Sequence, residues 1–458
     1  MKTFTSSFNK ICKNESLRLD FGIRYVDDIL DFNPLNIKDN YILLSDVLTE
    51  LKSKKFKKGD LDDEYYLVDL ENINKRFNSL INLEKVQTIE SDKTILQKGD
   101  LVIAKMTPKL GTMFLNLNHD EYIGSTELVE YKISNYDKLS LYYLLTTNKY
   151  LEVLGYMESG KNQRRVKPSD LLKLKIPKEN SEFINFISDS EAKLNEMFSK
   201  KKDMHEIIDS AFKSELNINK IQTNKQLSTK LSMVGDDNFC RCSFHNQNYY
   251  KTFEFKKLEN EKWCPIENKF QVKGGKRIPK GESFSNTPTE YYYLRPTEVS
   301  IVGLDKDNFP FISEKLHTLL KRYLISSGEF CVSNVGTLGK IGLIHLDELG
   351  IEDGNLILSE NFVKLVPTVE INEKFYYYYF NSYIFQKQID REYTITSIMK
   401  LGLDKVKKIS IPDFDNETEN QIINLVEDEL EKQKELIANI DAKRQEIDDT
   451  SSLMFASA

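Results

Sequence analysis

Apolar and polar positions alternate in short runs over two long stretches of the chain, from its start to about residue 180 and again from about 238 to 415. Runs such as "LVIAKM" (101–106) and "NLILSENFVKLV" (355–366) are bounded by Gly, Asn, Asp and Pro, which is the pattern of strands separated by turns. Each stretch also contains one longer apolar segment, 139–157 and 374–389, that predicts a helix. We therefore expect two β-rich modules that each include a helix.

A helical period follows each stretch. After Pro177 and again after Pro412, apolar residues recur at alternating spacings of three and four, as at the a and d positions of heptads. The first series is Ile187, Ser190, Leu194, Met197, Lys201, Met204, Ile208 and Ala211, and the second is Ile423, Val426, Leu430, Gln433, Ile437, Ile440, Arg444 and Ile447. The pattern predicts two long helices that pair as an antiparallel coiled coil. The alternative is that each helix packs on its own module.

The two stretches also resemble each other in sequence. Segment 14–21 aligns with 237–244, 65–73 with 292–300, 98–106 with 327–335, 125–133 with 359–367, and 171–177 with 406–412. The offset rises from 223 to 235 along the chain, as expected for duplicated modules that differ by loop insertions. The fold class is therefore α+β, with two duplicated mixed α/β domains that are each followed by a long helix. The expected boundaries are a first domain at 1–180, a first helix at 181–216, a polar linker at 217–237, a second domain at 238–415 and a second helix at 416–450.

Composition and charge narrow the class of protein. No run of about 18 apolar residues is present, so no membrane span is expected, and the first twenty residues lack the apolar stretch of a secretion signal. Five cysteines, an odd number, fit a reducing cytoplasm. The net charge of −7 is concentrated in residues 416–458, which contain eleven carboxylates and four basic side chains. The rest of the chain is balanced and holds local basic clusters, so the net charge does not exclude a nucleic-acid partner.

Motifs of catalysis and metal binding are missing from the sequence. The segment "GGKRIPKG" (274–281) lacks the Lys-Ser/Thr ending of a phosphate-binding loop, and no G-x-G-x-x-G follows a strand. Cys240 and Cys242 form a C-x-C pair without a second pair to complete a zinc site, and they replace the leucines at 17 and 19 of the first module. Core packing explains them better than a metal does. Glu127 and Glu360 have no companion His in equivalent positions of both halves, so we expect neither an active site nor a metal site.

Several segments of the second half carry a family resemblance. They are "GGKRIPKG", "YYYLRPTEVS", "GEFCVSNVGTLGKIGLI", "SENFVKLVP" and "KVKKISIPDFDNETENQIINLVEDELEKQKELI", in that order. With them the chain resembles the DNA-specificity (S) subunit of type I restriction–modification systems. The second half matches along about 180 residues, while the first half matches more loosely, with "AKMTPKLGTM" and "STEL" but no Gly-Gly-Lys-Arg turn.

The resemblance implies a non-catalytic subunit with two target-recognition domains, each of which reads one half of a bipartite, asymmetric site in double-stranded DNA. It also implies a scaffold for two methyltransferase subunits that bring S-adenosylmethionine to adenine N6, and for a motor–nuclease subunit in systems that restrict. This chain itself would hold no cofactor. In that setting the protein takes part in DNA methylation and phage defence. The coiled coil would set the separation of the half-sites, because 25 residues from Ile187 to Ala211 span roughly 36 Å, about one turn of B-DNA.

Basic clusters with glycine or amide neighbours are the candidate DNA contacts, since backbone amides and cations meet phosphate while Arg, Asn and Gln read base edges. The candidates are Lys105, Lys109, Lys161, Asn162, Gln163, Arg164, Arg165, Lys273, Lys276, Arg277, Lys280, Arg295 and Lys340. The candidate coiled-coil and partner contacts are Ile187, Leu194, Met204, Ile208, Val426, Leu430, Ile437 and Ile440. Each cation has the alternative of an ordinary soluble surface. The main rival for the whole chain is a duplicated, non-catalytic scaffold that binds a protein or a glycan and has no salt-dependent affinity for DNA.

Overall fold

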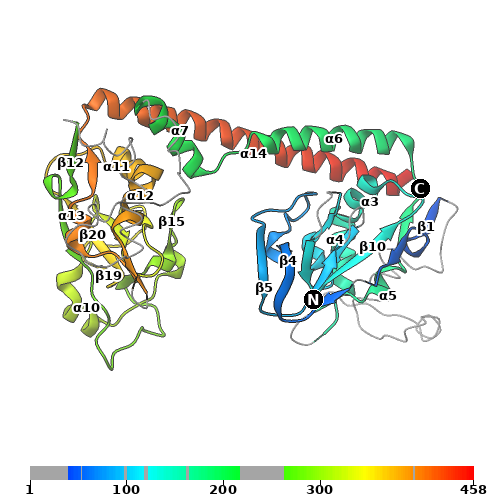
Figure 1. The fold of residues 1–458 in the computed structure, drawn as a ribbon, viewed down its shortest axis with the longest axis horizontal. Helices are drawn as coiled ribbons and strands as arrows, with labels where there is room; N and C mark the ends of the chain where they lie inside the picture. The colour runs from blue at the N-terminus through cyan, green and yellow to red at the C-terminus, as the bar shows by residue number, and fades with distance from the viewer. Residues whose placement is uncertain are drawn as a thin grey trace. The chain divides into compact units, whose positions relative to one another are not determined.

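The computed structural model describes residues 40–52, 54–96, 101–117, 122–160, 164–216, 262–395 and 398–457. The chain forms two compact units, coloured along the sequence in Figure 1. Unit 1 comprises Met1–Lys200 with Leu436–Ala458, and unit 2 comprises Lys201–Glu435. The predicted linker, 217–237, and the first pair of aligned segments, 14–21 and 237–244, lie outside the described residues.

Unit 1 is built on a four-stranded antiparallel sheet with the order β2-β10-β7-β8. The strands are β2 (Leu48–Glu50), β10 (Leu128–Ile133), β7 (Leu101–Ala104) and β8 (Met113–Leu115). The core beside the sheet comes from α3 (Lys138–Leu145) and α4 (Asn148–Met157), whose buried faces include Tyr142, Tyr150 and Leu154. A small pair, β1 (Tyr41–Leu43) with β11 (Lys175–Pro177), brings the two ends of the module together. The helix α5 (Pro168–Leu171) precedes β11.

Unit 2 repeats this plan with the sheet order β13-β20-β17-β18. The strands are β13 (Phe270–Gly274), β20 (Phe362–Pro367), β17 (Phe330–Ser333) and β18 (Ile341–Leu343), and they are also antiparallel. The matching helices are α11 (Glu373–Asn381), α12 (Tyr383–Glu392) and α13 (Leu403–Lys407), and the matching strand pair is β12 (Trp263–Pro265) with β23 (Ser410–Pro412). An aromatic cluster that includes Phe270, Phe330, Tyr376 and Phe380 fills this core.

The shared sheet order confirms the predicted duplication. Equivalent elements begin 222 residues apart at β1 and β12 and 235 apart at β11 and β23. The helices begin at equivalent distances too, since α3 and α11 start at Lys138 and Glu373. Sequence, topology and order of elements therefore agree, and the mixed α/β character of both modules is as expected.

The modules differ in the strands and helices that are added around the four-stranded sheet, both before β7 and β17 and after them. Unit 1 has a second sheet, of order β3-β6-β9-β4-β5, in which the long strand β4 pairs with β5 across a bulge. Its strands are β3 (Lys55–Phe56), β4 (Gly59–Val68), β5 (Glu84–Ile89), β6 (Lys93–Leu96) and β9 (Tyr122–Ser125). Unit 2 has instead the parallel pair β14 (Tyr292–Leu294) with β19 (Leu356–Leu358), the short pair β15 (Val299–Ser300) with β16 (Gly303–Leu304), and the helix α10 (Glu314–Leu320).

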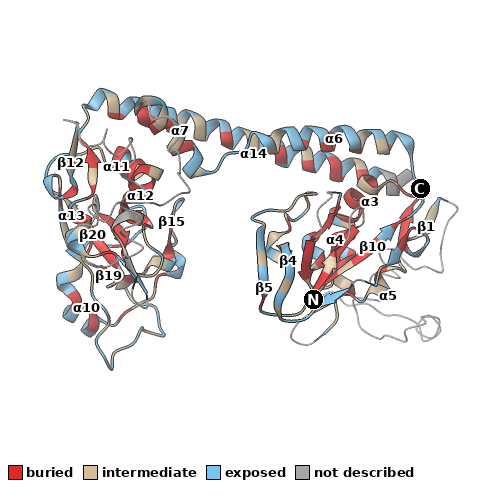
Figure 2. Ribbon diagram, viewed as in Figure 1, coloured by how far each residue is buried: buried red, intermediate tan, exposed pale blue. Residues whose placement is uncertain are grey.

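The helices that follow the modules pack against each other within each unit. In unit 1, α6 (Ser181–Ser199) places Ile187 and Leu194 in one core with Ile440 and Ile447 of α14 (Asn416–Ser457). In unit 2, α7 (Met204–Leu216) places Ile208 in one core with Val426 of the same long helix. Met204 and Leu430 are half-buried against that core. Buried and exposed positions accordingly alternate along α14 in Figure 2.

The pairing runs antiparallel. In unit 1, Lys443 Nζ lies 5.2 Å from the centre of the Phe186 ring, while in unit 2 the Lys202 amide donates to Gln433 Oε1 at 3.0 Å. The contacts on α14 therefore move toward its start as the first helical segment advances. Each unit thus combines one module with a helix that follows the other module in sequence.

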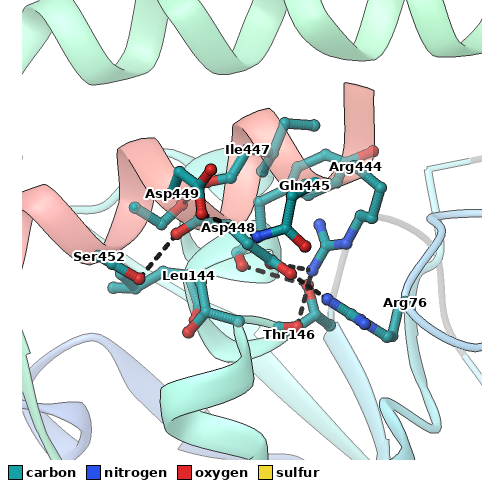
Figure 3. A network of polar contacts seen from close by, with 12 residues as sticks. Arg76, Leu144, Thr146, Arg444, Gln445, Ile447, Asp448, Asp449 and Ser452 are labelled. Atoms are coloured by element: carbon teal, nitrogen blue, oxygen red, sulfur yellow. Dashed lines mark hydrogen bonds and ion pairs between the residues drawn. The ribbon is translucent and has the colours of Figure 1, made fainter. Parts of the chain in front are cut away.

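A buried polar network holds α14 in place within unit 1 (Figure 3). Arg444, only 4% exposed, donates from Nη2 to the Thr146 carbonyl at 2.7 Å and to its hydroxyl at 3.0 Å, and it pairs with Asp448 at 3.1 Å. Arg76 also pairs with Asp448, and the Arg444 guanidinium lies over the Tyr143 ring. The network fixes the helix to the junction of α3 and α4.

Unit 2 has equivalent contacts between its helix α7 and the junction of α11 and α12. Asp209 of α7 accepts from the Tyr383 amide at 2.6 Å, and His205 Nδ1 lies 3.0 Å from the Asn381 carbonyl oxygen. Asp209 and Arg444 are 235 residues apart, the same offset as the modules they contact. The duplication therefore includes the way in which each helix meets its module.

Two predictions about the helices are wrong. The first helix is not continuous over 181–216, because α6 ends at Ser199 and α7 begins at Met204. Three adjacent lysines, 200–202, repel one another in one turn, and Asp203 starts a new helix by a reciprocal cap: it accepts from the Glu206 amide at 2.8 Å while Glu206 accepts from the Asp203 amide at 3.2 Å. The length of about 36 Å expected from one unbroken seam therefore does not apply.

The second error concerns the register of the seam on α14. Ile437 was expected to be buried but is 44% exposed, and its neighbour Leu436 packs on the core of unit 1 instead. Both spacings from Gln433 to Ile440, three then four or four then three, fit a period of 3.6, so the packing partner decides which residue faces inward. Among the described helices, none has a stretch long and apolar enough to span a membrane.

Candidate nucleic-acid interface

One end of each four-stranded sheet collects the predicted contact residues. In an antiparallel sheet, the carboxyl ends of alternate strands and the amino ends of their neighbours meet at the same edge. In unit 2 this edge bears the turn after β13, the turn before β20 and the turn between β17 and β18. We call these segments, 274–280, 334–340 and 359–361, with the bonded hairpin strand 398–401, the loop edge of unit 2. The matching loop edge of unit 1 is 105–112, 125–127, 159–160 and 164–166.

The basic turn of unit 2 is held on the sheet through its backbone. The Gly275 amide donates to the Phe362 carbonyl at 3.1 Å and the Lys276 amide to the Leu358 carbonyl at 3.1 Å. A Cβ on Gly275 would lie 1.9 Å from the Ser359 carbonyl oxygen, so only glycine fits this close approach. Tyr293 donates its hydroxyl to the Lys276 carbonyl at 2.7 Å. The turn therefore presents its side chains from a fixed backbone.

The cations of this turn point into solvent. Lys273, Lys276 and Lys280 are exposed, and their ammonium groups make no hydrogen bond or ion pair with the part of the chain that the structure describes. Arg277 is also exposed, and its Nε donates to Glu360 at 2.8 Å. One carboxylate thus partly offsets four cations, and the segment keeps an excess of positive charge.

Arg295 and Lys340 differ from that group because both are already engaged. Arg295 donates through Nε and Nη2 to Glu298, which is 3% exposed, and its guanidinium lies 5.4 Å from the centre of the Phe284 ring. Lys340 donates from Nζ to the Pro296 carbonyl at 2.8 Å. Both residues are at the loop edge or next to it, but a contact with an outside partner would have to replace or share these bonds.

The loop edge of unit 1 holds its cations in a similar way. Arg165 makes two bonds of 2.9 Å to Glu127, and this pairing lowers the pKa of the Glu127 carboxyl. Lys109 pairs at 3.0 Å with Glu158, whose side chain is buried. Lys105 is half-buried, its backbone amide donates to the Glu127 carbonyl, and its carbonyl accepts from the Val166 amide. Arg164 is exposed.

Three predicted contacts, Lys161, Asn162 and Gln163, lie outside the described residues. Their segment is closed by a two-bond pair between Ser159 and Arg165 at 2.9 Å each, and Arg165 also bridges to Met106 on the loop edge. The described residues on either side of them, Ser159 and Arg165, therefore lie with the other unit 1 candidates.

Sequence reasoning missed the counterpart of this segment in unit 2. The hairpin of β21 (Thr394–Ile395) and β22 (Met399–Lys400) occupies the equivalent position, because Lys400 bridges to Val335 as Arg165 bridges to Met106. The offset of 235 found for neighbouring segments would have aligned 165 with 400. Lys400 is the one cation in 394–400, so a search for clusters of several basic residues passed over the hairpin.

Among the described residues, no group of three or more His, Cys, Asp and Glu could hold a metal ion. The C-x-C pair, Cys240 and Cys242, lies outside them. Glu127 and Glu360, the carboxylates considered as acid–base residues, each pair with an arginine at the loop edge of their own unit. This pairing positions the basic side chains of both modules.

Comparisons with known proteins gave likenesses in structure but not in sequence. No protein-family model matches the chain, and no curated protein matches it. A chain from a type I R-M system studied for its complex assembly and conformational transition covers 90% of this chain and 95% of its own length, with 11% identity and a TM-score of 0.43. The S subunit of a type I restriction–modification system from M. genitalium matches 91% of this chain and 98% of its own, with 14% identity and a TM-score of 0.38. The HsdS subunit from Thermoanaerobacter tengcongensis matches 92% and 96%, with 12% identity and a TM-score of 0.35.

Proposed function

We propose that this chain is a sequence-specific DNA-binding subunit that reads a bipartite site, one half with the loop edge of each unit. The observation that carries the proposal is the duplicated loop edge itself. Two modules with the same sheet order present, at the same end of the sheet, exposed cations on a bonded backbone. Exposed Lys and Arg meet phosphates, and side chains on rigid loops between them reach base edges.

The two loop edges differ in chemistry, so the half-sites differ. Unit 2 offers three exposed lysines on a glycine turn, whereas unit 1 offers Arg164 and the Arg165–Glu127 pair. An asymmetric bipartite target follows from two readers of the same fold with different side chains.

The further roles are those implied by the resemblance to S subunits of type I restriction–modification systems. The chain scaffolds two methyltransferase subunits, which bring S-adenosylmethionine to adenine N6, and it accepts motor–nuclease subunits in a system that restricts. It performs no chemistry itself, and the assembly acts on DNA in the cytoplasm. The long helix α14, which contributes to both units, is the segment we assign to the docking of the methyltransferase subunits.

Selection from a random duplex library tests this proposal. The complex is purified from its host through an affinity tag on this chain, and bound duplexes are sequenced at several salt concentrations. We expect one motif with two unequal blocks separated by unspecified bases, and an affinity that falls steeply with salt. Retention of no duplex at 50 mM salt would favour the rival function, a scaffold that binds a protein or a glycan.

A further inference from the structure

Three exposed apolar side chains lie on the loop edge of unit 2 or directly beside it. Ile398 is 55% exposed, Met399 is 42% exposed and Leu403 is 39% exposed. They come from the β21–β22 hairpin and from the start of α13, which follows it directly. Side chains of this kind are usually buried, and these three are exposed within six residues of the chain; we call them the patch.

The patch is rigidly attached to the sheet. Asn334 at the end of β17 makes two bonds to Leu401, from its side-chain amide at 3.2 Å and through its backbone carbonyl at 2.9 Å. The Gly336 amide donates to the Met399 carbonyl at 3.0 Å. Leu403 lies over Gly274, where an added methyl group would be 3.7 Å from Leu403 Cδ1. The apolar side chains are therefore presented in a fixed position, which lowers the entropic cost of binding.

Exposed cations flank the patch. Lys400 follows Met399 in sequence, and Lys273 precedes Gly274 under Leu403. Cations beside a small apolar surface match the major groove of DNA, where phosphates border the bases and the thymine C5-methyl is the apolar group that base pairs present.

We propose that Ile398, Met399 and Leu403 read thymine in the half-site of unit 2 through its 5-methyl group. This inference rests on the proposed function and specifies its chemistry. The equivalent position in unit 1 ends in Arg164 and Arg165; Arg165 is bound to Glu127, whereas Arg164 is exposed and its guanidinium group suits the acceptors of guanine. The same structural position therefore selects a methyl group in one half-site and hydrogen-bond acceptors in the other.

Replacing thymine by uracil isolates the methyl group. The tagged complex is used to select its motif, and each thymine of the motif is then replaced singly by deoxyuridine in competition binding assays. For wild type we expect roughly fourfold weaker binding at one or two of these positions, the value for losing one buried methyl group. The variants Ile398→Ala and Met399→Ala should bind the thymine and uracil duplexes equally well.

Val369→Ala is the matched control. Val369 is 49% exposed and follows β20 at the opposite end of the same sheet, so this variant should keep the fourfold preference for thymine. A selected motif at which uracil is tolerated everywhere, or a Met399→Ala complex that keeps the preference, would overturn the inference and leave the proposed function standing. Loss of a protein subunit from the two hairpin variants, with unchanged DNA affinity, would assign the patch to a protein interface and also overturn it. Enrichment of no motif would refute the proposed function itself.

Discussion

Replacing Arg444 by methionine tests how the C-terminal helix is held on unit 1. Methionine keeps much of the apolar volume but removes the charge, so the Thr146 carbonyl loses its donor and Asp448 keeps only Arg76 as a partner (Figure 3). Breaking a buried ion pair from one side costs roughly 3–5 kcal/mol. Because Arg76 remains in place, we expect the lower end of that range, about 3 kcal/mol, which is roughly a 150-fold change in an opening equilibrium.

Hydrogen–deuterium exchange resolved by peptides measures this change directly, since it reports local opening in a protein whose two units need not unfold together. Amides of α14 in unit 1 and of the α3–α4 junction should exchange roughly 150-fold faster in Arg444→Met, while those of unit 2 stay as in wild type. Ile437→Ala on the same helix is the control, because Ile437 is exposed and its truncation should leave exchange nearly unchanged.

The double variant Arg444→Met with Asp448→Leu sharpens the test. Because Asp448 also pairs with Arg76, the double variant leaves the half-buried Arg76 guanidinium without its carboxylate, so no protection should return beyond that of Arg444→Met alone. Exchange in Arg444→Met within threefold of wild type would refute the view that this network holds the helix.

Three further predictions concern the loop edges and the first turn of α14. Charge reversal at Lys276 and Arg277 should weaken binding to all DNA sequences alike and reduce the slope of log affinity against log salt by about 2, as measured by DNA titration at several salt concentrations. Lys408→Glu, at the other end of the sheet, is the control. Arg164→Gln should change the selected bases in one half-site only; an unchanged motif would remove Arg164 from the readers. Burial raises the pKa of Glu419 to about 7, although the nearby Lys269 partly opposes this shift. The folded chain therefore holds a proton on Glu419 that the unfolded chain has already released, and the wild type should lose up to roughly 3 kcal/mol of unit 2 stability as pH rises from about 4.5 to 7. Glu419→Gln, which resembles the protonated form, should match wild type in urea denaturation at pH 4.5 and exceed it at pH 8.

The sequence predicted the features that recur in both modules, because each recurrence is an independent sign of the same fold. Five weak sequence matches in the same order were enough to identify β7 as the equivalent of β17 and β11 as the equivalent of β23. The structure has the same sheet order in both modules. The heptad series likewise located Ile187, Leu194 and Ile440 in one core.

Features that occur once were harder to predict. Asp203 follows three lysines and starts a new helix through a cap that depends on the Glu206 side chain, so the helix breaks although the heptad series continues to Ala211. Ile437 and Leu436 are equally compatible with the helical period, and only the core of unit 1 selects Leu436. The extra sheet of unit 1 rests on pairing between strands far apart in the sequence.

The candidate site was predictable as a set of cations but not in its details. Arg295 was expected to be available for a base edge, yet Glu298 three residues later binds its guanidinium in a turn that the sequence alone did not indicate. The hairpin residues Ile398 and Met399 were missed because an apolar side chain is expected to be buried, and the sequence does not show that these two are exposed. Both cases depend on which atoms a side chain meets in the folded chain.

The most direct test of the central claim is single-molecule sequencing of adenine methylation in host DNA, with and without this gene. The account predicts that deletion abolishes methylation at one motif with two unequal blocks, and that reintroduced Arg164→Gln restores methylation with a change in one block only. A methylome that is the same with and without the gene, in a host where the chain is expressed and its partner methyltransferase is active, would contradict it.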